Sequence, residues 1–90
     1  MLSLAETKAY LRVDTSDEDK LIESLIEQSE DIVKDVARAE TIDDIEDIPV
    51  VKTAGLYTVA YLFEHREESN MHALMLTLRS LLFGVRRVIV

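Results

Sequence analysis

Hydrophobic residues along this chain recur mostly three or four positions apart, which is the spacing of helices rather than strands. The clearest case is a stripe within residues 21–36, with charged side chains filling the positions between. We expect one long amphipathic helix there, reaching about Arg38. Its buried face would consist of Leu21, Ile22, Leu25, Ile26, Ile32, Val33 and Val36.

Two further segments are predicted to be helical from their start signals. Ser3 followed by Glu6 forms a capping box, which predicts a short helix over residues 4–11. Pro49 suits the first position of a helix over residues 49–66. Because that second segment is apolar on nearly all sides, we expect it at the centre of the fold.

The C-terminal part of the chain predicts one more helix, over residues 71–83, whose leucines would face inward. Gly84 follows as a candidate C-cap, and the β-branched residues beyond it disfavour helix. We therefore expect residues 85–90, VRRVIV, to lie outside the helix as a mobile apolar end. Such an end either frays or becomes ordered on another protein surface.

The connection between the second and third helices spans residues 40–48 and carries Ile42, Ile45 and Ile48 at three-residue spacing. This spacing predicts one turn of helix packed on the core. The 90 residues contain only two glycines and one proline, so few turns are expected. The sequence predicts an all-α fold, with residues 1–90 forming one small single-domain bundle of about four helices.

Charge is distributed unevenly along the chain, whose formal net charge is −8. Residues 1–48 carry 15 acidic and 5 basic side chains, a net of −10, and residues 49–90 carry 3 and 5, a net of +2. Nucleic-acid affinity depends on clustered Lys and Arg, so general DNA binding is disfavoured. The longest uncharged run, residues 53–63, is much shorter than a membrane span.

The stretch DTSDEDKLIESLIEQ, residues 14–28, puts four carboxylates immediately before the long apolar stripe. A calcium loop would need a central glycine and alternating ligands, and neither is present. The simpler interpretation is a helix start, because acidic side chains favour the positive end of the helix dipole. Thr15 or Ser16 would then be the N-cap, with Glu18 or Asp19 completing a capping box.

Catalytic and cofactor motifs are not found in this sequence. The chain has no Cys, its two histidines do not form a metal-binding pair, and there is no glycine-rich phosphate loop or nucleophile elbow. We therefore expect no enzymatic activity, no metal and no cofactor.

Contact with other proteins is the function that the charge pattern favours. Three C-terminal arginines, with Lys52, could form a basic patch, although matching of a helix dipole and surface solvation would also explain them. An acidic surface, such as the first half of another copy, would suit both this patch and the apolar end. The candidate contact residues are Arg79, Arg86, Arg87, Val88, Ile89 and Val90 on one side, and Asp17 and Glu18 on the other.

Two long stretches carry a pattern of known type: LAETKAYLRVDTSDEDKLIESLIEQSEDIV and VVKTAGLYTVAYLFEHRE. They resemble the small head–tail connector proteins of tailed bacteriophages, often described as DNA packaging proteins, and the resemblance covers almost the whole chain. Departures from the family pattern are Phe63 in place of a tyrosine, and Ser29 and Gly55 in place of alanines. The matching residues are Lys8, Tyr10, Leu11, Arg12, Asp14, Glu18, Asp19, Leu21, Ile22, Leu25, Ile26, Pro49, Lys52, Glu64, Arg66, Leu74, Leu78, Leu81, Leu82 and Arg86.

This resemblance implies a non-enzymatic structural protein of a phage or prophage. Copies of the chain would form an oligomeric ring at the portal, matching its symmetry, and join the DNA-filled head to the tail. Its partners would be the portal protein and downstream head-closure or tail proteins, with DNA passing through without sequence-specific binding. The chain would reside at the head–tail junction of the virion, and in the host cytoplasm during assembly.

Two alternatives stay open at the level of the sequence. One is a small acidic helical binding module that regulates a basic partner protein. The other is a DNA-contacting accessory of the packaging machinery.

Overall fold

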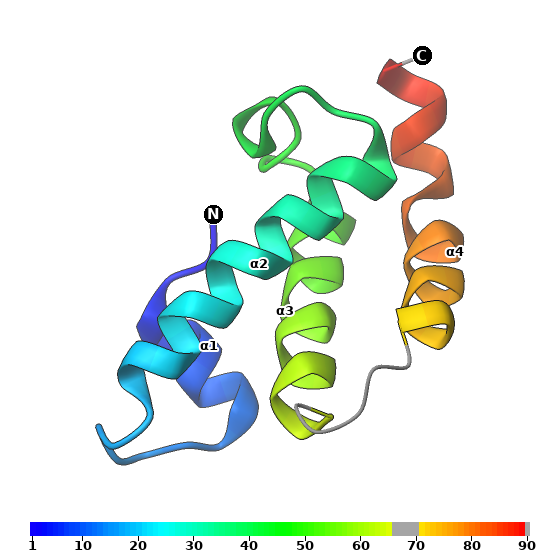
Figure 1. Ribbon diagram of the computed structural model, residues 1–90. Helices are drawn as coiled ribbons and strands as arrows, with labels where there is room; N and C mark the ends of the chain where they lie inside the picture. The colour runs from blue at the N-terminus through cyan, green and yellow to red at the C-terminus, as the bar shows by residue number, and fades with distance from the viewer. Residues whose placement is uncertain (66–70, 90) are drawn as a thin grey trace.

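The computed structural model describes the backbone of residues 1–65 and 71–89, and the side chains of residues 1–65 and 71–85. Within these ranges the chain forms helices and no strand, which confirms the predicted all-α class (Figure 1). The elements are α1 (Leu4–Leu11), α2 (Asp19–Ala37), the short 3-10 helix η1 (Ile42–Asp44), α3 (Pro49–Glu64) and α4 (Met71–Ile89).

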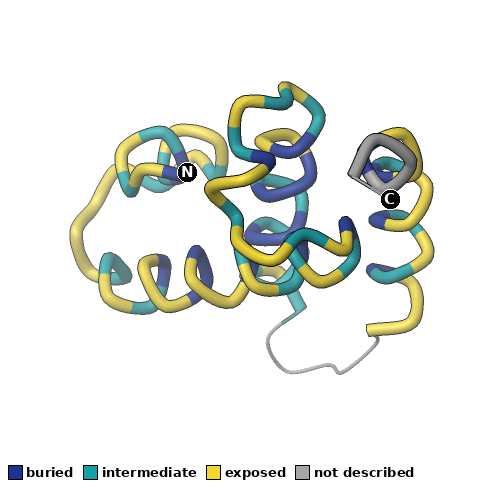
Figure 2. Tube along the Cα trace, turned by 90° about the horizontal axis from the view of Figure 1, so that it is seen from above, coloured by how far each residue is buried: buried dark blue, intermediate teal, exposed yellow. Residues whose placement is uncertain are grey.

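Helix α3 is the central element, as its apolar sequence predicted. It packs against α1, α2 and α4, and α2 runs obliquely across it (Figure 1). Seen from above, buried positions concentrate in the middle of the molecule and exposed ones follow its outer edge (Figure 2). Small buried residues of α3, including Ala54, Gly55 and Thr58, allow its neighbours to approach closely.

Two groups of buried side chains make up the core. One joins α2, α3 and α4 around Val33, Val51 and Leu78. The other joins α1, α2 and α3 around Ile22 and Val59. The isoleucine-spaced connection also behaves as predicted, because Ile45 is fully buried and closes the first group beside η1.

The start of α1 is the predicted capping box, but the start of α2 differs from the prediction. Neither Thr15 nor Ser16 caps α2, which begins at Asp19 and has Glu18 in the N-cap position without a side-chain cap bond. The amide of Asp19 instead donates to the Ser16 carbonyl at 3.3 Å, so a turn precedes the helix. Lys8 of α1 reaches the Asp19 carboxylate at 2.7 Å, and this ion pair draws the helix start toward α1.

Helices α1 and α2 both end at an arginine in the left-handed conformation. Arg12 and Arg38 have φ of 61°, and each donates its amide back to the last turn of its helix. Left-handed backbone costs a non-glycine residue about 1 kcal/mol, so tertiary packing must hold these two turns. Glycine is the usual residue in this conformation, and both positions are arginines, so neither left-handed turn was predictable from the local sequence.

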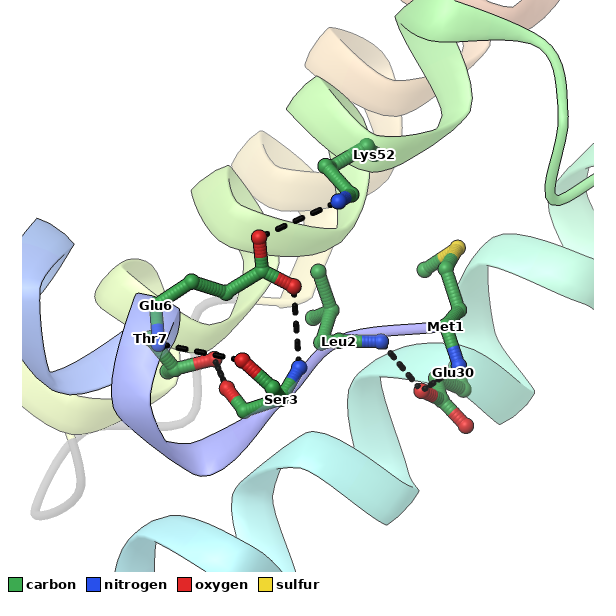
Figure 3. Close-up of polar contacts among 7 residues, drawn as sticks. All are labelled: Met1, Leu2, Ser3, Glu6, Thr7, Glu30 and Lys52. Atoms are coloured by element: carbon green, nitrogen blue, oxygen red, sulfur yellow. Dashed lines mark hydrogen bonds and ion pairs between the residues drawn. The ribbon is translucent and has the colours of Figure 1, made fainter.

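The N-terminal segment is held in place by contacts with α2 and α3 (Figure 3). The amide of Leu2 donates to the Glu30 carboxylate at 3.1 Å. Glu6 accepts from the Ser3 amide at 2.9 Å and from the Lys52 ammonium at 3.1 Å. Leu2 itself lies against Gly55 of α3, where a Cβ would come within 3.2 Å of it. The segment thus fastens α1, which has few apolar residues, to the rest of the fold.

The prediction that the last helix ends before Gly84 is wrong. Helix α4 continues to Ile89, so residues 85–89 are helical, while residue 90 lies outside the described residues. Val85 is only 3% exposed and packs in the same core group as Leu78 and Leu82. It continues their stripe at helical spacing, and its burial outweighs the roughly 1 kcal/mol that a glycine costs inside a helix.

Replacing Gly84 by alanine distinguishes a helix interior from a helix end. The φ of Gly84 is not positive and a Cβ there would meet nothing within 4 Å, so Gly84→Ala should stabilise the fold by about 1 kcal/mol. Gly55→Ala is the matched control and should gain less, because Met1 and Leu2 would have to move. Urea unfolding measures both. A loss of stability in Gly84→Ala would indicate a left-handed cap at this position.

Ser29 is fully buried in α2, and its hydroxyl finds no hydrogen-bond partner among the described residues. Ser29→Ala should therefore raise the free energy of unfolding by about 1 kcal/mol, because it removes a desolvated polar group. Thr58→Val should gain less, since the Thr58 hydroxyl donates to the Ala54 carbonyl at 2.8 Å. Thermal unfolding compares the two variants, and a destabilised Ser29→Ala would contradict the expectation.

Glu6 makes part of the stability depend on pH. The Ser3 amide, and then the Lys52 ammonium, hold the pKa of Glu6 below its ordinary value of 4.5. A lowered carboxyl pKa stabilises the fold above the unfolded-state pKa, and this contribution is lost as pH falls through the folded-state pKa. Glu6→Gln should cost about 0.5 kcal/mol at pH 7, since the pair is solvent-accessible, and almost nothing once the pH lies below the lowered folded-state pKa of Glu6. Unfolding curves at several pH values test this, and a pH-independent difference would contradict it.

Candidate functional site

The outward side of α4 is the most conspicuous apolar surface of the described residues. Leu76 and Phe83 are 52% and 58% exposed, and the exposed Arg79 lies between them at helical spacing. We call Leu76, Arg79 and Phe83 the α4 outer face. Residues 71–89 carry three arginines and no acidic residue, so this helix is basic. Arg79 makes no ion pair with any described residue.

The other C-terminal candidates lie further along the same helix. Arg86, Arg87, Val88 and Ile89 occupy its last turns, with side chains outside the described part, and Val90 lies beyond it. Sequence reasoning missed Leu76 and Phe83 as surface residues. A signal was available, because both fall off the stripe formed by the buried leucines of this helix.

A shallow groove of about 280 Å³ adjoins this face, between the C-terminal half of α2 and α4. Its lining is apolar at Ile32, Val36 and Met75, and charged at its other positions, Asp35, Arg38 and Arg79. Arg79 therefore belongs both to the groove and to the α4 outer face. Such a site can receive an apolar side chain together with a carboxylate.

The predicted acidic contact lies in the connection between α1 and α2, residues 12–18, which we call the acidic bend. Asp14 and Asp17 are exposed, and Glu18 is half-buried. Arg12 offsets one of these three charges, leaving a net of −2. Directly before the bend, in the last turn of α1, Tyr10 is 51% exposed. The bend is thus acidic with an aromatic side chain next to it.

A second acidic surface lies elsewhere, in residues 40–47 around η1. This connection carries five acidic residues and no basic one. Asp43, Asp44 and Asp47 are exposed, and Asp44 accepts from the Thr41 amide at 3.2 Å. Ile45 is fully buried and Ile42 is partly buried against the core, so the surface is mainly polar. We call residues 40–47 the acidic loop.

The predicted basic and acidic contacts do not meet within one copy. The acidic bend and α4 lie at opposite ends of the molecule in both views (Figures 1 and 2). Across the described residues α1 makes no contact with α4. Each copy therefore presents two surfaces of opposite charge that face away from each other.

The histidines and carboxylates of the described residues do not form a metal-binding cluster. No three of their His, Asp and Glu side chains are gathered closely enough to hold a metal ion. His65 ends α3 and stacks on the Tyr61 ring at 4.2 Å, which is a structural role, and His72 is exposed. No helix in the described ranges is long and apolar enough to cross a membrane.

Comparison with protein families shows to which family the chain belongs. The model of the phage gp6-like head–tail connector proteins matches residues 1–89, which is nearly the whole chain. Comparison with curated proteins and with solved structures gave no match. The family match agrees with the resemblance seen in the sequence and with the all-α fold. The chain belongs to the family of phage gp6-like head–tail connector proteins.

Proposed function

We propose that this connector protein acts as a non-enzymatic adaptor, in which identical copies form a ring between the portal and the tail. The family match over residues 1–89 is the observation that carries this proposal. The ring would reside at the head–tail junction of the virion, after assembly in the host cytoplasm. Its neighbours would be the portal protein on one side and head-closure or tail proteins on the other.

The distribution of charge supports a ring. A ring requires heterologous contacts, in which one surface of a copy meets a different surface of the next. The basic α4 and the acidic bend are two such surfaces, and they lie at opposite ends of the molecule. A chain with one self-complementary surface would instead form a two-fold dimer, in which the same surface of both copies meets.

The acidic loop supports a channel through which DNA passes without being held. It carries a net charge of −5 and exposes Asp43, Asp44 and Asp47. Phosphate groups are repelled by such a surface, whereas binding would need clustered Lys or Arg. Placed toward the channel, this loop would keep the wall from retaining the DNA.

Purified chain mixed with the portal protein of the same phage tests the proposed function. We expect ring-shaped particles on the portal in negative-stain images, and native mass spectrometry should give a copy number that matches the portal symmetry. Binding to duplex DNA should be undetectable at about 0.1 M salt, where exposed charges are screened beyond about 10 Å. A chain that stays monomeric on the portal, yet binds DNA in a salt-sensitive way, would instead be a DNA-contacting accessory.

A further inference from the structure

The α4 outer face combines two kinds of interaction on one helix surface. Leu76 and Phe83 are each more than half exposed, although both are large apolar side chains. Arg79 lies between them and makes no ion pair with any described residue. Large exposed apolar side chains around an arginine are typical of protein–protein contacts, whose centres are enriched in aromatic residues and arginine.

The acidic bend offers the complementary combination. Asp14 and Asp17 are exposed and make no ion pair with any described residue. Tyr10 supplies an exposed aromatic ring in the last turn of α1, directly before the bend. Arg79 of one copy can therefore pair with the carboxylates of Asp14 and Asp17 in another. The apolar side chains of the α4 outer face can pack on the Tyr10 ring, for which the adjoining groove lined by Ile32 and Met75 leaves room.

The acidic loop is the other candidate for this contact, and it has the larger negative charge. Its apolar residues, however, are largely covered by the core. Ile45 is fully buried, and Ile42 and Ile48 pack against the core. Docking on the loop would place Leu76 and Phe83 mainly against carboxylates, which gains little apolar burial. The acidic bend with Tyr10 offers both a charged partner for Arg79 and an apolar partner for Leu76 and Phe83.

We propose that the α4 outer face (Leu76, Arg79 and Phe83) docks on the acidic bend, together with Tyr10, of a second copy of this chain. The proposal rests on the proposed ring and names the two surfaces that build it. The two surfaces lie at opposite ends of one copy, so two docked copies still present one free α4 outer face and one free acidic bend. Repetition then gives a closed ring or a continuing chain rather than a two-fold dimer.

Charge reversal on each surface tests the contact. Arg79→Glu and the double variant Asp14→Lys with Asp17→Lys should each weaken self-association by about tenfold or more, because like charges then face each other. Sedimentation velocity over a concentration series measures this. All three positions are exposed, and circular dichroism with thermal unfolding verifies that the variants stay folded.

Mixing the two variants gives the sharpest outcome. The Arg79→Glu chain keeps a native bend, and the double variant keeps a native α4 outer face, so the mixture should recover complexes with a 1:1 composition in native mass spectrometry. Combining all three changes in one chain should also restore association, since the charges are then exchanged. Failure of both restorations would overturn the proposed pairing.

The acidic loop supplies the matched control. Asp43→Lys with Asp47→Lys makes the same change of charge at two exposed aspartates, and it should leave self-association within about twofold of the parent, since the loop carries no docking residue. If the loop variant weakens association and the bend variant does not, the loop is the receiving surface and the inference is wrong.

The portal experiment separates this inference from the proposed function. Rings of Arg79→Glu that assemble on the portal as well as the parent does would overturn the α4 contact while leaving the adaptor function intact. Normal self-association of Arg79→Glu with lost portal attachment would show that the portal, rather than a second copy, occupies the α4 outer face. A parent chain that forms no ring under any of these conditions would overturn both.

Discussion

Burial of α3 between three other helices is the interaction on which the rest of this structure depends. Its sequence leaves few polar positions, so the helix is stable only when neighbours cover most of its surface. Helices α1, α2 and α4 each cover a different part of it. Because Ala54 and Gly55 have small side chains or none, the N-terminal segment and the adjoining helices can approach the α3 backbone closely. Both groups of buried side chains in this 90-residue chain include residues of α3.

Because burial uses the apolar stripes, the charged residues are left to the surface, and chain order decides where each group lies. The acidic bend follows α1 and lies at the far end of the molecule from α4, which is the last element of the chain. One charge pair, Lys8 with Asp19, is used internally to set the start of α2. Asp14 and Asp17 of the bend are exposed, which makes their carboxylates available to another protein. The same fold that hides the leucines thus gives the molecule two ends of different charge.

Helix α4 illustrates how packing changes the meaning of a local signal. A glycine followed by β-branched residues and arginines is typical of a helix end. Here Val85 belongs to the core group that contains Leu78 and Leu82, and continuing the helix keeps it on the same buried stripe. The helix is longer as a result, and Arg86 and Arg87 are part of it rather than of a separate end. This changes the expected contact from an apolar tail to a helix face.

Much of the fold was predictable from local features of the sequence. The capping box at Ser3 and Glu6, the first-position Pro49 and the long stripe of α2 each depend on neighbouring residues only, so their helices were predictable. The opposed charges of the two halves were also visible, as was the resemblance to the connector family. Tertiary structure alone decided the true start of α2, the left-handed turns at Arg12 and Arg38, and the length of α4. It also decided that Tyr10, directly before the acidic bend, faces solvent. Each of these depends on contacts between residues far apart in the chain, which a local pattern does not contain.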